Sequence, residues 1–279
     1  MRQRREIKAN TQSGVKARMA KIITICNQKG GTGKTTTAVN LSAALADCGK
    51  KVLLVDMDPQ GNATSGVGIN KNEIKHSAYE VLLHKIQAPQ AILKTANTKL
   101  DVIPCNIHLT GAEIELVGVL SRENRLKKAL IEVRSQYDYI LLDSPPSLGL
   151  LTLNALVAAD SIIIPIQCEF YALEGVSQLL NTIGLVRDGL NSNLEIEGVL
   201  LTMADIRTNL SVEVINEIRN YFKEKVYQAI IPRNIRLSEA PSHGKPINAY
   251  DPSSIGAKKY AELAEEVIRR NNPTAILSK

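Results

Sequence analysis

The chain has 279 residues, of which 44% are hydrophobic, which supports a sizeable core in one large α/β domain or in two small ones. It has no tryptophan and two phenylalanines, so we expect an aliphatic core. No apolar run approaches the length of a membrane span and no signal-peptide pattern is visible, which argues against membrane-embedded and secreted classes.

The net charge of +6 is concentrated at the N-terminus. Residues 1–18 carry six basic side chains and one acidic side chain, so five of the six net positive charges belong to them. We predict a basic, disordered leader over residues 1–19, one domain over 20–272 and a short tail over 273–279. The leader is either a basic arm with non-specific affinity for nucleic acid or anionic membranes, or an artefact of start-site choice. We favour the artefact, because Met19-Ala20-Lys21 leads directly into the first predicted strand.

The four cysteines give no sign of a disulfide framework or a metal site. Cys26, Cys48, Cys105 and Cys168 are scattered along the chain without CxxC spacing. We therefore expect buried, reduced thiols, which fits a cytoplasmic protein.

The first predicted strand, 22–25, runs into a glycine-rich turn and then into a helix over 35–46. The glycines let the backbone approach an anion closely, and the helix N-terminus directs free N–H groups and its dipole at that anion. Lys34 would reach the outer phosphates of a nucleotide, and the Thr35 hydroxyl would hold Mg²⁺. Strand, loop and helix in this order predict a phosphate-binding loop, or P-loop.

Strands and helices alternate along the rest of the chain. Buried strands are predicted at 51–55, 100–104, 139–142, 161–166, 197–201 and 226–231. Helices are predicted at 77–96, 173–190, 210–222 and 255–270, and residues 109–135 carry two helical patterns. This alternation predicts an α/β fold: a single-domain P-loop NTPase with a mostly parallel twisted sheet covered by helices on both faces. The chemistry is expected at the carboxyl edge of that sheet.

Three aspartates follow predicted strands. Asp56 and Asp58 are two residues apart and point the same way if the backbone there is extended. Asp143 follows an apolar strand, which is the Walker B arrangement that serves Mg²⁺. The simpler alternative, helix capping, is open for each of them, and for Asp143 we favour the metal role. The segments 58–66 and 143–150 are interpreted as switch loops rather than ordinary loops.

The glycine-rich loop departs from the standard P-loop pattern in two places. Gln28 stands where the first glycine is expected, and Lys29 is an additional lysine ahead of Lys34. The sequence KGGTGKTT at 29–36 resembles the signature of the deviant Walker A ATPases. In that family the first lysine reaches across a dimer to the partner's ATP, and the resemblance assigns this role to Lys29. A surface turn without a ligand is the alternative that we set aside.

Most of the chain from Ala20 onward resembles the chromosomal partition ATPases of the ParA/Soj family. Matching segments include LLVDMDPQGNATSG at 53–66, YDYILLDSPPSLGLLTLNAL at 137–156 and IPRNIRLSEAPSHGKPI at 231–247. The resemblance implies ATP and Mg²⁺ as cofactors, and catalysis by Lys29, Lys34 and Asp58. It implies a metal site of Thr35 and Asp143, with Asp56 in its outer shell. The implied nucleotide contacts are Lys29, Gly30, Gly31, Thr32, Gly33, Lys34, Thr35 and Thr36 in the loop, and Met203, Pro232 and Asn234 around the adenine.

The same resemblance implies partners and a location on the nucleoid. It implies an ATP-dependent homodimer, non-specific binding to double-stranded DNA, and slow hydrolysis stimulated by a ParB-type centromere-binding protein. DNA contacts are assigned to Arg207 and Arg236, for which a solvated face is the alternative. A replication initiator is a further candidate partner.

Two rival functions stay open. The first is a membrane-associated spatial regulator of the MinD kind, and the second is a nucleotide-gated regulator of replication initiation. The last predicted helix carries Glu262, Glu265 and Glu266 and few bulky apolar residues, so we expect no stable membrane anchor there.

Overall fold

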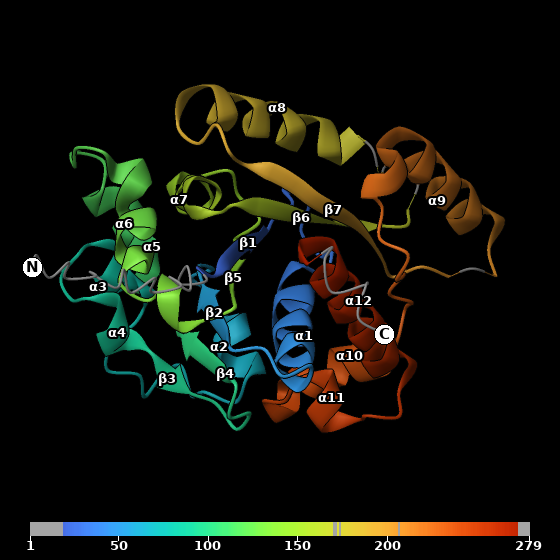
Figure 1. The fold of residues 1–279 in the computed structure, drawn as a ribbon, viewed down its shortest axis with the longest axis horizontal. Coiled ribbons are helices and arrows are strands. Elements are labelled where there is room, and N and C mark those ends of the chain that lie inside the picture. The colour runs from blue at the N-terminus through green and yellow to red at the C-terminus, as the bar shows by residue number, and fades with distance from the viewer. Residues whose placement is uncertain (1–18, 170–171, 173, 206, 273–279) are drawn as a thin grey trace, which may run out of the picture.

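The computed structural model describes residues 19–169, 172, 174–205 and 207–272 (Figure 1). Residues 1–18 of the predicted leader and the tail over 273–279 lie outside the described residues. The described chain forms one seven-stranded sheet in the order β3-β4-β2-β5-β1-β6-β7, in which β3 alone is antiparallel to its neighbour. The strands are β1 (Lys21–Ile25), β2 (Val52–Asp56), β3 (Leu93–Lys94), β4 (Leu100–Ile103), β5 (Tyr139–Asp143), β6 (Ser161–Gln167) and β7 (Glu195–Thr202).

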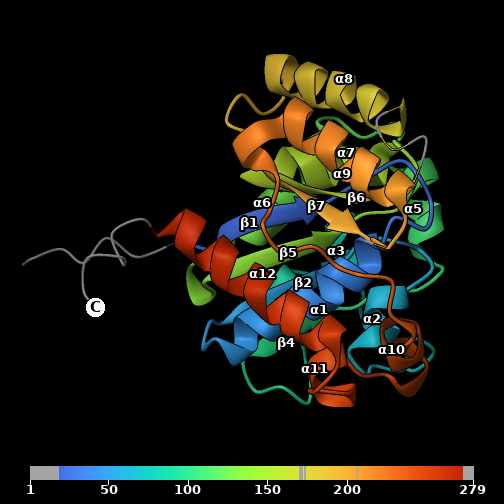
Figure 2. The same cartoon turned by 90° about the vertical axis from the view of Figure 1, so that its right-hand side faces the viewer.

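Helices cover both faces of the sheet. The first face is covered by α3 (Ala78–Leu82), α4 (Ala88–Ala91), α5 (Leu109–Glu115), α6 (Arg125–Ile131), α7 (Leu150–Ala158), α8 (Glu174–Gly189) and α9 (Asn209–Phe222). The second face is covered by α1 (Lys34–Asp47), α2 (Asn62–Gly66), α10 (Ile235–Glu239), α11 (Ile247–Tyr250) and α12 (Ile255–Asn271). Both views show α1 and α12, from opposite ends of the sequence, lying side by side (Figures 1 and 2). The predicted α/β class with a doubly covered, mostly parallel sheet is confirmed.

The apolar strand sequences explain this layering, because successive side chains of a strand point to opposite faces. Ile22 packs in the core under α3 to α9, whereas its neighbour Ile23 packs in the core under α1 and α12. In β2, Leu53 likewise packs in the first of these cores and Leu54 in the second. Both cores are mainly aliphatic, as the composition predicts.

The predicted last strand over 226–231 is wrong. Among the described residues, Val226 makes an isolated bridge with Val199, and Pro232, just past the segment, makes one with Ala204, but no strand forms. The N–H groups of Tyr227 and Ile231 donate to β7 at 2.9 Å each, but between them the N–H groups of Gln228 and Ala229 donate to the buried Glu266 carboxylate of α12. Those donors are therefore not available to a sheet ladder.

The predicted helix over 77–96 is also wrong as one element. The chain forms α3, a turn, α4 and then the short β3. His84 after α3 has a φ of 54°, in the left-handed region that ends helices, and Pro89 lies in the first turn of α4. The short helices α2, α7, α10 and α11 were not predicted.

The expectations for the cysteines and for membrane-spanning helices concern the part of the chain that the structure describes. Cys26, Cys105 and Cys168 are buried free thiols, but Cys48 at the end of α1 is exposed, which corrects the expectation of four buried thiols. Within the described ranges, no helix has both the length and the apolar character needed to cross a bilayer.

Candidate nucleotide-binding site

The sheet brings the predicted acidic residues to the edge where the P-loop begins. In the parallel ladders, Asp143 at the end of β5 pairs with Ile25 at the end of β1 on one side and with Asp56 at the end of β2 on the other. The chain leaves β1 at this point and enters the loop that leads to α1. The three strand ends therefore converge on one place.

The P-loop closes around the ammonium group of Lys34. Lys34 is 6% exposed, and its Nζ donates to the backbone oxygen of Lys29 at 3.1 Å. Gly33 precedes α1 with a φ of 84°, which favours glycine. Burial lowers the pKa of Lys34, and the nearby Asp143 charge opposes this shift. A buried cation inside a glycine-rich loop at a helix N-terminus forms a site for the phosphates of a nucleotide.

Side chains that the sequence did not single out hold the loop in place. Asn27 donates to the Pro165 oxygen at 2.7 Å and accepts from the Lys29 N–H at 3.1 Å. The buried Thr202 at the end of β7 donates to the Thr32 oxygen at 2.9 Å. The sequence does carry a signal for Thr202, because it is the polar residue that directly follows the apolar strand predicted over 197–201. Gln28 is not among the positive-φ residues, so a side chain fits this position without backbone strain.

Lys29 lies on the outer lip of the loop and turns away from the Lys34 site. Its side chain is 40% exposed, and its Nζ lies 3.4 Å from Oε2 of Glu169. Arg233 approaches the other oxygen of Glu169 at 3.8 Å. The two lysines of the signature therefore have different environments, one buried among the loop carbonyls and one in a half-exposed ion pair.

Asp143 has the features of a cation ligand. Both carboxylate oxygens are buried without a hydrogen-bond partner among the described residues. Burial and the neighbouring Asp56 charge raise the pKa of Asp143 well above its usual range, while the nearby Thr35 hydroxyl opposes the rise. A divalent cation would supply the missing partner, because carboxylate and hydroxyl oxygens are the ligands that Mg²⁺ prefers. The residues present fit a Mg²⁺ ion held by Thr35 and Asp143.

Asp56 and Asp58 organise the first predicted switch loop. The fully buried Asp56 accepts from the Thr64 N–H at 2.8 Å, the Thr64 hydroxyl at 2.7 Å and the Asp58 N–H at 3.1 Å. Burial raises the pKa of Asp56 to about 6 despite these bonds. Asp58 accepts from the Gln60 N–H at 3.0 Å and is 9% exposed. With its carboxylate already bonded to protein donors, Asp56 suits an outer-shell role better than direct metal contact.

A cavity of about 450 Å³ extends from the start of α1 and collects the three predicted adenine contacts. Met203, Pro232 and Asn234 line it together with Gly33 and Thr36 of the P-loop. Met203 has a φ of 52°, in the left-handed region that non-glycine residues rarely adopt. Asn234 uses its Oδ1 to cap α10 through the Arg236 N–H at 2.8 Å, which leaves its amide N–H groups for a ligand.

The two predicted DNA-binding arginines lie outside this cavity and pair with nearby carboxylates. Arg207 forms a two-pronged contact with Asp205 at 2.8 and 2.7 Å, and its side chain is 86% exposed. Arg236 lies 2.9 Å from Glu239 and 3.6 Å from Asp251. These exposed pairs are weak, so they leave both guanidinium groups accessible to a phosphate backbone.

The fold and the loop define a P-loop nucleoside triphosphatase. A family model described as an AAA domain matches residues 20–196. The chain is 62% identical over 249 residues to the sporulation initiation inhibitor protein Soj of Bacillus subtilis, covering 89% of this chain and 98% of that protein. It is 54% identical to the chromosome partitioning protein ParA of Myxococcus xanthus, covering 92% of this chain and 91% of that protein.

A solved structure shares the architecture. Cobyrinic acid a,c-diamide synthase from Mycobacterium smegmatis, solved with a bound ATP analog and magnesium, superposes with a TM-score of 0.80 at 37% identity and covers 91% of this chain and 96% of that one. This structure shows the fold, and the two relatives above show the family. The chain belongs to the ParA/Soj family of chromosome-partitioning ATPases.

Proposed function

We propose that this ATPase binds ATP with Mg²⁺, dimerises around two nucleotides, binds DNA non-specifically in that state, and leaves DNA when a partner stimulates hydrolysis. The observation that carries the proposal is the different placement of two lysines in one P-loop. Lys34 is buried within the loop, whereas Lys29 is half-exposed on its lip. A half-exposed lysine in a weak ion pair can exchange Glu169 for phosphates bound in another subunit.

The proposed catalytic roles are supported by the charges at the carboxyl edge of the sheet. Mg²⁺, when bound by Thr35 and Asp143, would neutralise charge on the phosphates. Lys34 would hold the outer phosphates, and Asp58 would orient or deprotonate the attacking water. Asp56 would keep the Asp58 turn in place through its bonds to Thr64 and to the Asp58 N–H. A hydrolysis step that depends on this turn can be regulated through the loop that carries it.

The DNA and partner steps are supported by the family and by the accessible arginines. Arg207 and Arg236 would each contribute a weak phosphate contact, and pairing two such surfaces in a dimer raises avidity steeply. The relatives are chromosome-partitioning proteins, which supports a ParB-type partner at centromere-like DNA. Release of this chain from DNA would then follow hydrolysis, and the cycle would take place on the nucleoid.

A membrane-associated role of the MinD kind is less well supported. The apolar side of α12, which includes Tyr260, Leu263 and Val267, is buried against the second face of the sheet and α1. That side of the helix is therefore not free to enter a bilayer. A regulatory role is better supported, because a 62% identical relative is named as an inhibitor of sporulation initiation. In that case nucleotide occupancy would gate binding to a replication initiator or to promoter DNA.

The deciding experiment is non-specific duplex DNA binding by the purified chain with ATP, with ADP and without nucleotide, across a salt series. It should be run with and without residues 1–18. Tight, salt-sensitive binding that needs ATP and survives removal of residues 1–18 is the expected result. Binding that ignores nucleotide and disappears with residues 1–18 would refute the proposal, and liposome binding would then test the membrane role.

A further inference from the structure

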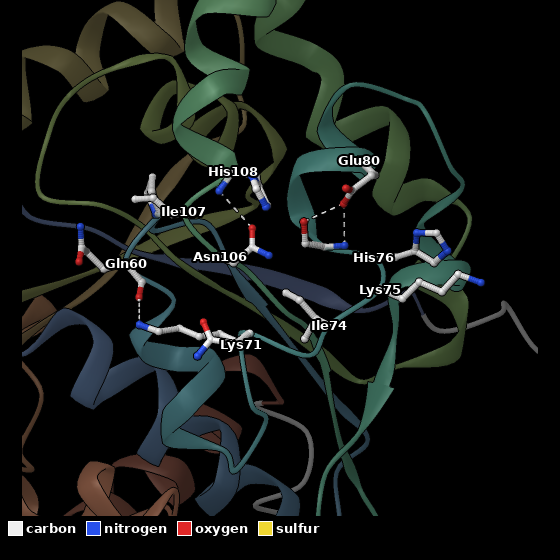
Figure 3. Close-up of a pocket in the computed structure, with 12 residues that line it drawn as sticks. Gln60, Lys71, Ile74, Lys75, His76, Glu80, Asn106, Ile107 and His108 are labelled. Atoms are coloured by element: carbon white, nitrogen blue, oxygen red, sulfur yellow. Dashed lines mark hydrogen bonds between the residues drawn. The ribbon is translucent and has the colours of Figure 1, made fainter.

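A second cavity, of about 430 Å³, lies beside the turn that carries Asp58, and none of the roles above uses it (Figure 3). Its walls come from the turn after β2, the loop between α2 and α3, and the loop between β4 and α5. Because one wall is the predicted switch loop itself, a ligand here would touch the backbone next to the proposed catalytic aspartate.

The charge of this cavity favours an anion. Lys71, Lys75, His76 and His108 line it, and all four can donate hydrogen bonds to oxygen. Among the described lining residues, Glu80 is the one carboxylate. Its Oε2 accepts from the Ser77 N–H at 2.8 Å and from the Ser77 hydroxyl at 2.7 Å, which caps α3. The acid is thus occupied by the protein, so it is not available to neutralise the two lysines of the lining.

The distribution of the charges decides which anion fits. In Figure 3, Lys71 lies beside Gln60, whereas Lys75 and His76 lie at the other side of the cavity, near Glu80. Because the cations lie on two sides of the cavity, a chain with several spaced anions would meet more of them than a single phosphate would. The lining residues that the structure describes include no Phe, Tyr or Trp on which bases of a single strand could stack, and a hollow of this size does not admit a duplex. We propose that the cavity binds an acidic peptide segment of a partner protein.

The cavity is connected to Asp58 by two hydrogen bonds through one residue. Lys71 Nζ donates to the Gln60 oxygen at 2.6 Å, and the Gln60 N–H donates to the Asp58 carboxylate at 3.0 Å. Gly61 has no room for a side chain, since a Cβ there would lie 2.7 Å from the Cys105 oxygen and 3.0 Å from the Lys71 side chain. A peptide carboxylate competes for the Lys71 ammonium and releases the Gln60 oxygen. Binding therefore changes how the Asp58 turn is held, and this regulatory step rests on the catalytic role proposed for Asp58.

The binding test uses the full chain without nucleotide and a labelled peptide of alternating aspartate and serine, followed by fluorescence anisotropy. Salt-sensitive binding is expected, weakened at least threefold by Lys71→Met and again by Lys75→Gln with His76→Gln. Lys258→Met on α12, an exposed lysine on the other face of the sheet, is the matched control and should change nothing. Binding that none of the cavity variants weakens overturns the proposal. Displacement of the peptide by equal concentrations of inorganic phosphate or oligothymidylate also overturns the peptide assignment.

The regulatory step is tested by basal ATP turnover with and without the peptide. Lys71→Met removes the same bond that the peptide removes, so both should shift the rate in the same direction, and the peptide should have no further effect on the variant. An equal effect of peptide on both proteins contradicts the coupling through Lys71. Because the binding assay contains no nucleotide, loss of peptide binding leaves the partition proposal standing. Failure of ATP-dependent DNA binding equally leaves the cavity proposal standing.

Discussion

The Lys29 ammonium lies 3.4 Å from the Glu169 carboxylate of the same chain, so the lysine expected to serve a second subunit is held in its own subunit first. The two side chains are 40% and 46% exposed, and such a pair contributes about 0–1 kcal/mol. We predict that Glu169→Gln tightens ATP-dependent dimerisation by about two- to fivefold, because dimerisation no longer has to break the pair. Analytical ultracentrifugation with ATP measures this shift.

Two controls isolate the effect of Glu169. Glu262→Gln breaks another exposed lysine–glutamate pair, the 2.7 Å contact with Lys259 on α12, and should leave dimerisation unchanged. In a Lys29→Ala background the Glu169 substitution should have no effect on dimerisation. A shift that persists without Lys29 would show that Glu169 acts through some other contact.

Replacing Lys34 should abolish nucleotide binding. Its ammonium is buried and bonded to the loop carbonyl of Lys29, so Lys34→Ala removes the charge from the centre of the loop. A hydrogen bond to a charged group contributes about 1.5–3 kcal/mol. Losing two such bonds between Lys34 and the phosphates lowers the affinity for nucleotide by at least about a hundredfold. Titration with a fluorescent ATP analog measures the loss, and circular dichroism checks that the fold is kept. Near-normal affinity would remove Lys34 from the phosphate site.

Asp58→Ala should separate ATP binding from hydrolysis. Losing the group that orients or deprotonates water lowers turnover by about 10²–10⁴-fold, while the phosphate contacts of the P-loop remain. The ATP-bound protein should therefore stay on DNA after the wild-type chain has been released. Single-turnover hydrolysis and DNA dissociation, measured on the same sample, test both parts. Normal hydrolysis in this variant would refute the catalytic assignment.

Local signals were sufficient to predict the P-loop and the acidic strand ends. The order of strand, glycine-rich turn and helix places Lys34 and Thr35, and the apolar strands place Asp56 and Asp143 at one edge. The contacts that depend on tertiary structure were not predictable. Glu169 meets Lys29, and Thr202 meets Thr32, across more than a hundred residues of sequence. No local pattern specifies such partners, because they depend on the order of the strands in the sheet.

The failed strand over 226–231 has the same cause. Its residues are apolar enough for a strand, but the backbone donors of Gln228 and Ala229 are bound by Glu266 from α12. A glutamate in an amphipathic helix is normally expected at the surface, and here it is 4% exposed. The exception arises because the N–H groups of Gln228 and Ala229, which lie between the two residues that bond to β7, need an acceptor of their own.

Arg207→Ala and Arg236→Ala should each weaken DNA binding without changing sequence preference. Each substitution removes one phosphate contact, so the slope of log affinity against log salt should fall by about one for each arginine. Lys128→Ala, an exposed lysine on α6, is the matched loss of charge. Binding to unrelated duplexes across a salt series provides the slopes. An unchanged slope in both arginine variants would place the DNA surface elsewhere on the molecule.

Thiol chemistry should distinguish Cys48 from the other three cysteines. Burial raises the pKa of Cys26 to about 12 and that of Cys168 to about 11, and it raises the pKa of Cys105 further. Only the thiolate reacts, so near pH 8 these three buried groups stay protonated and shielded. Cys48 is exposed, and its pKa is raised by partial burial and by the charges of Glu265 and Asp47. Its alkylation should therefore accelerate as pH rises and should exceed that of the others by at least about tenfold in the native chain.

Mass spectrometry after a timed pulse of iodoacetamide measures each site, and all four should react in denaturant. Rapid native labelling of Cys26, which lies at the start of the P-loop, would mean that the loop opens far more often than its hydrogen bonds to Pro165 and Thr202 suggest.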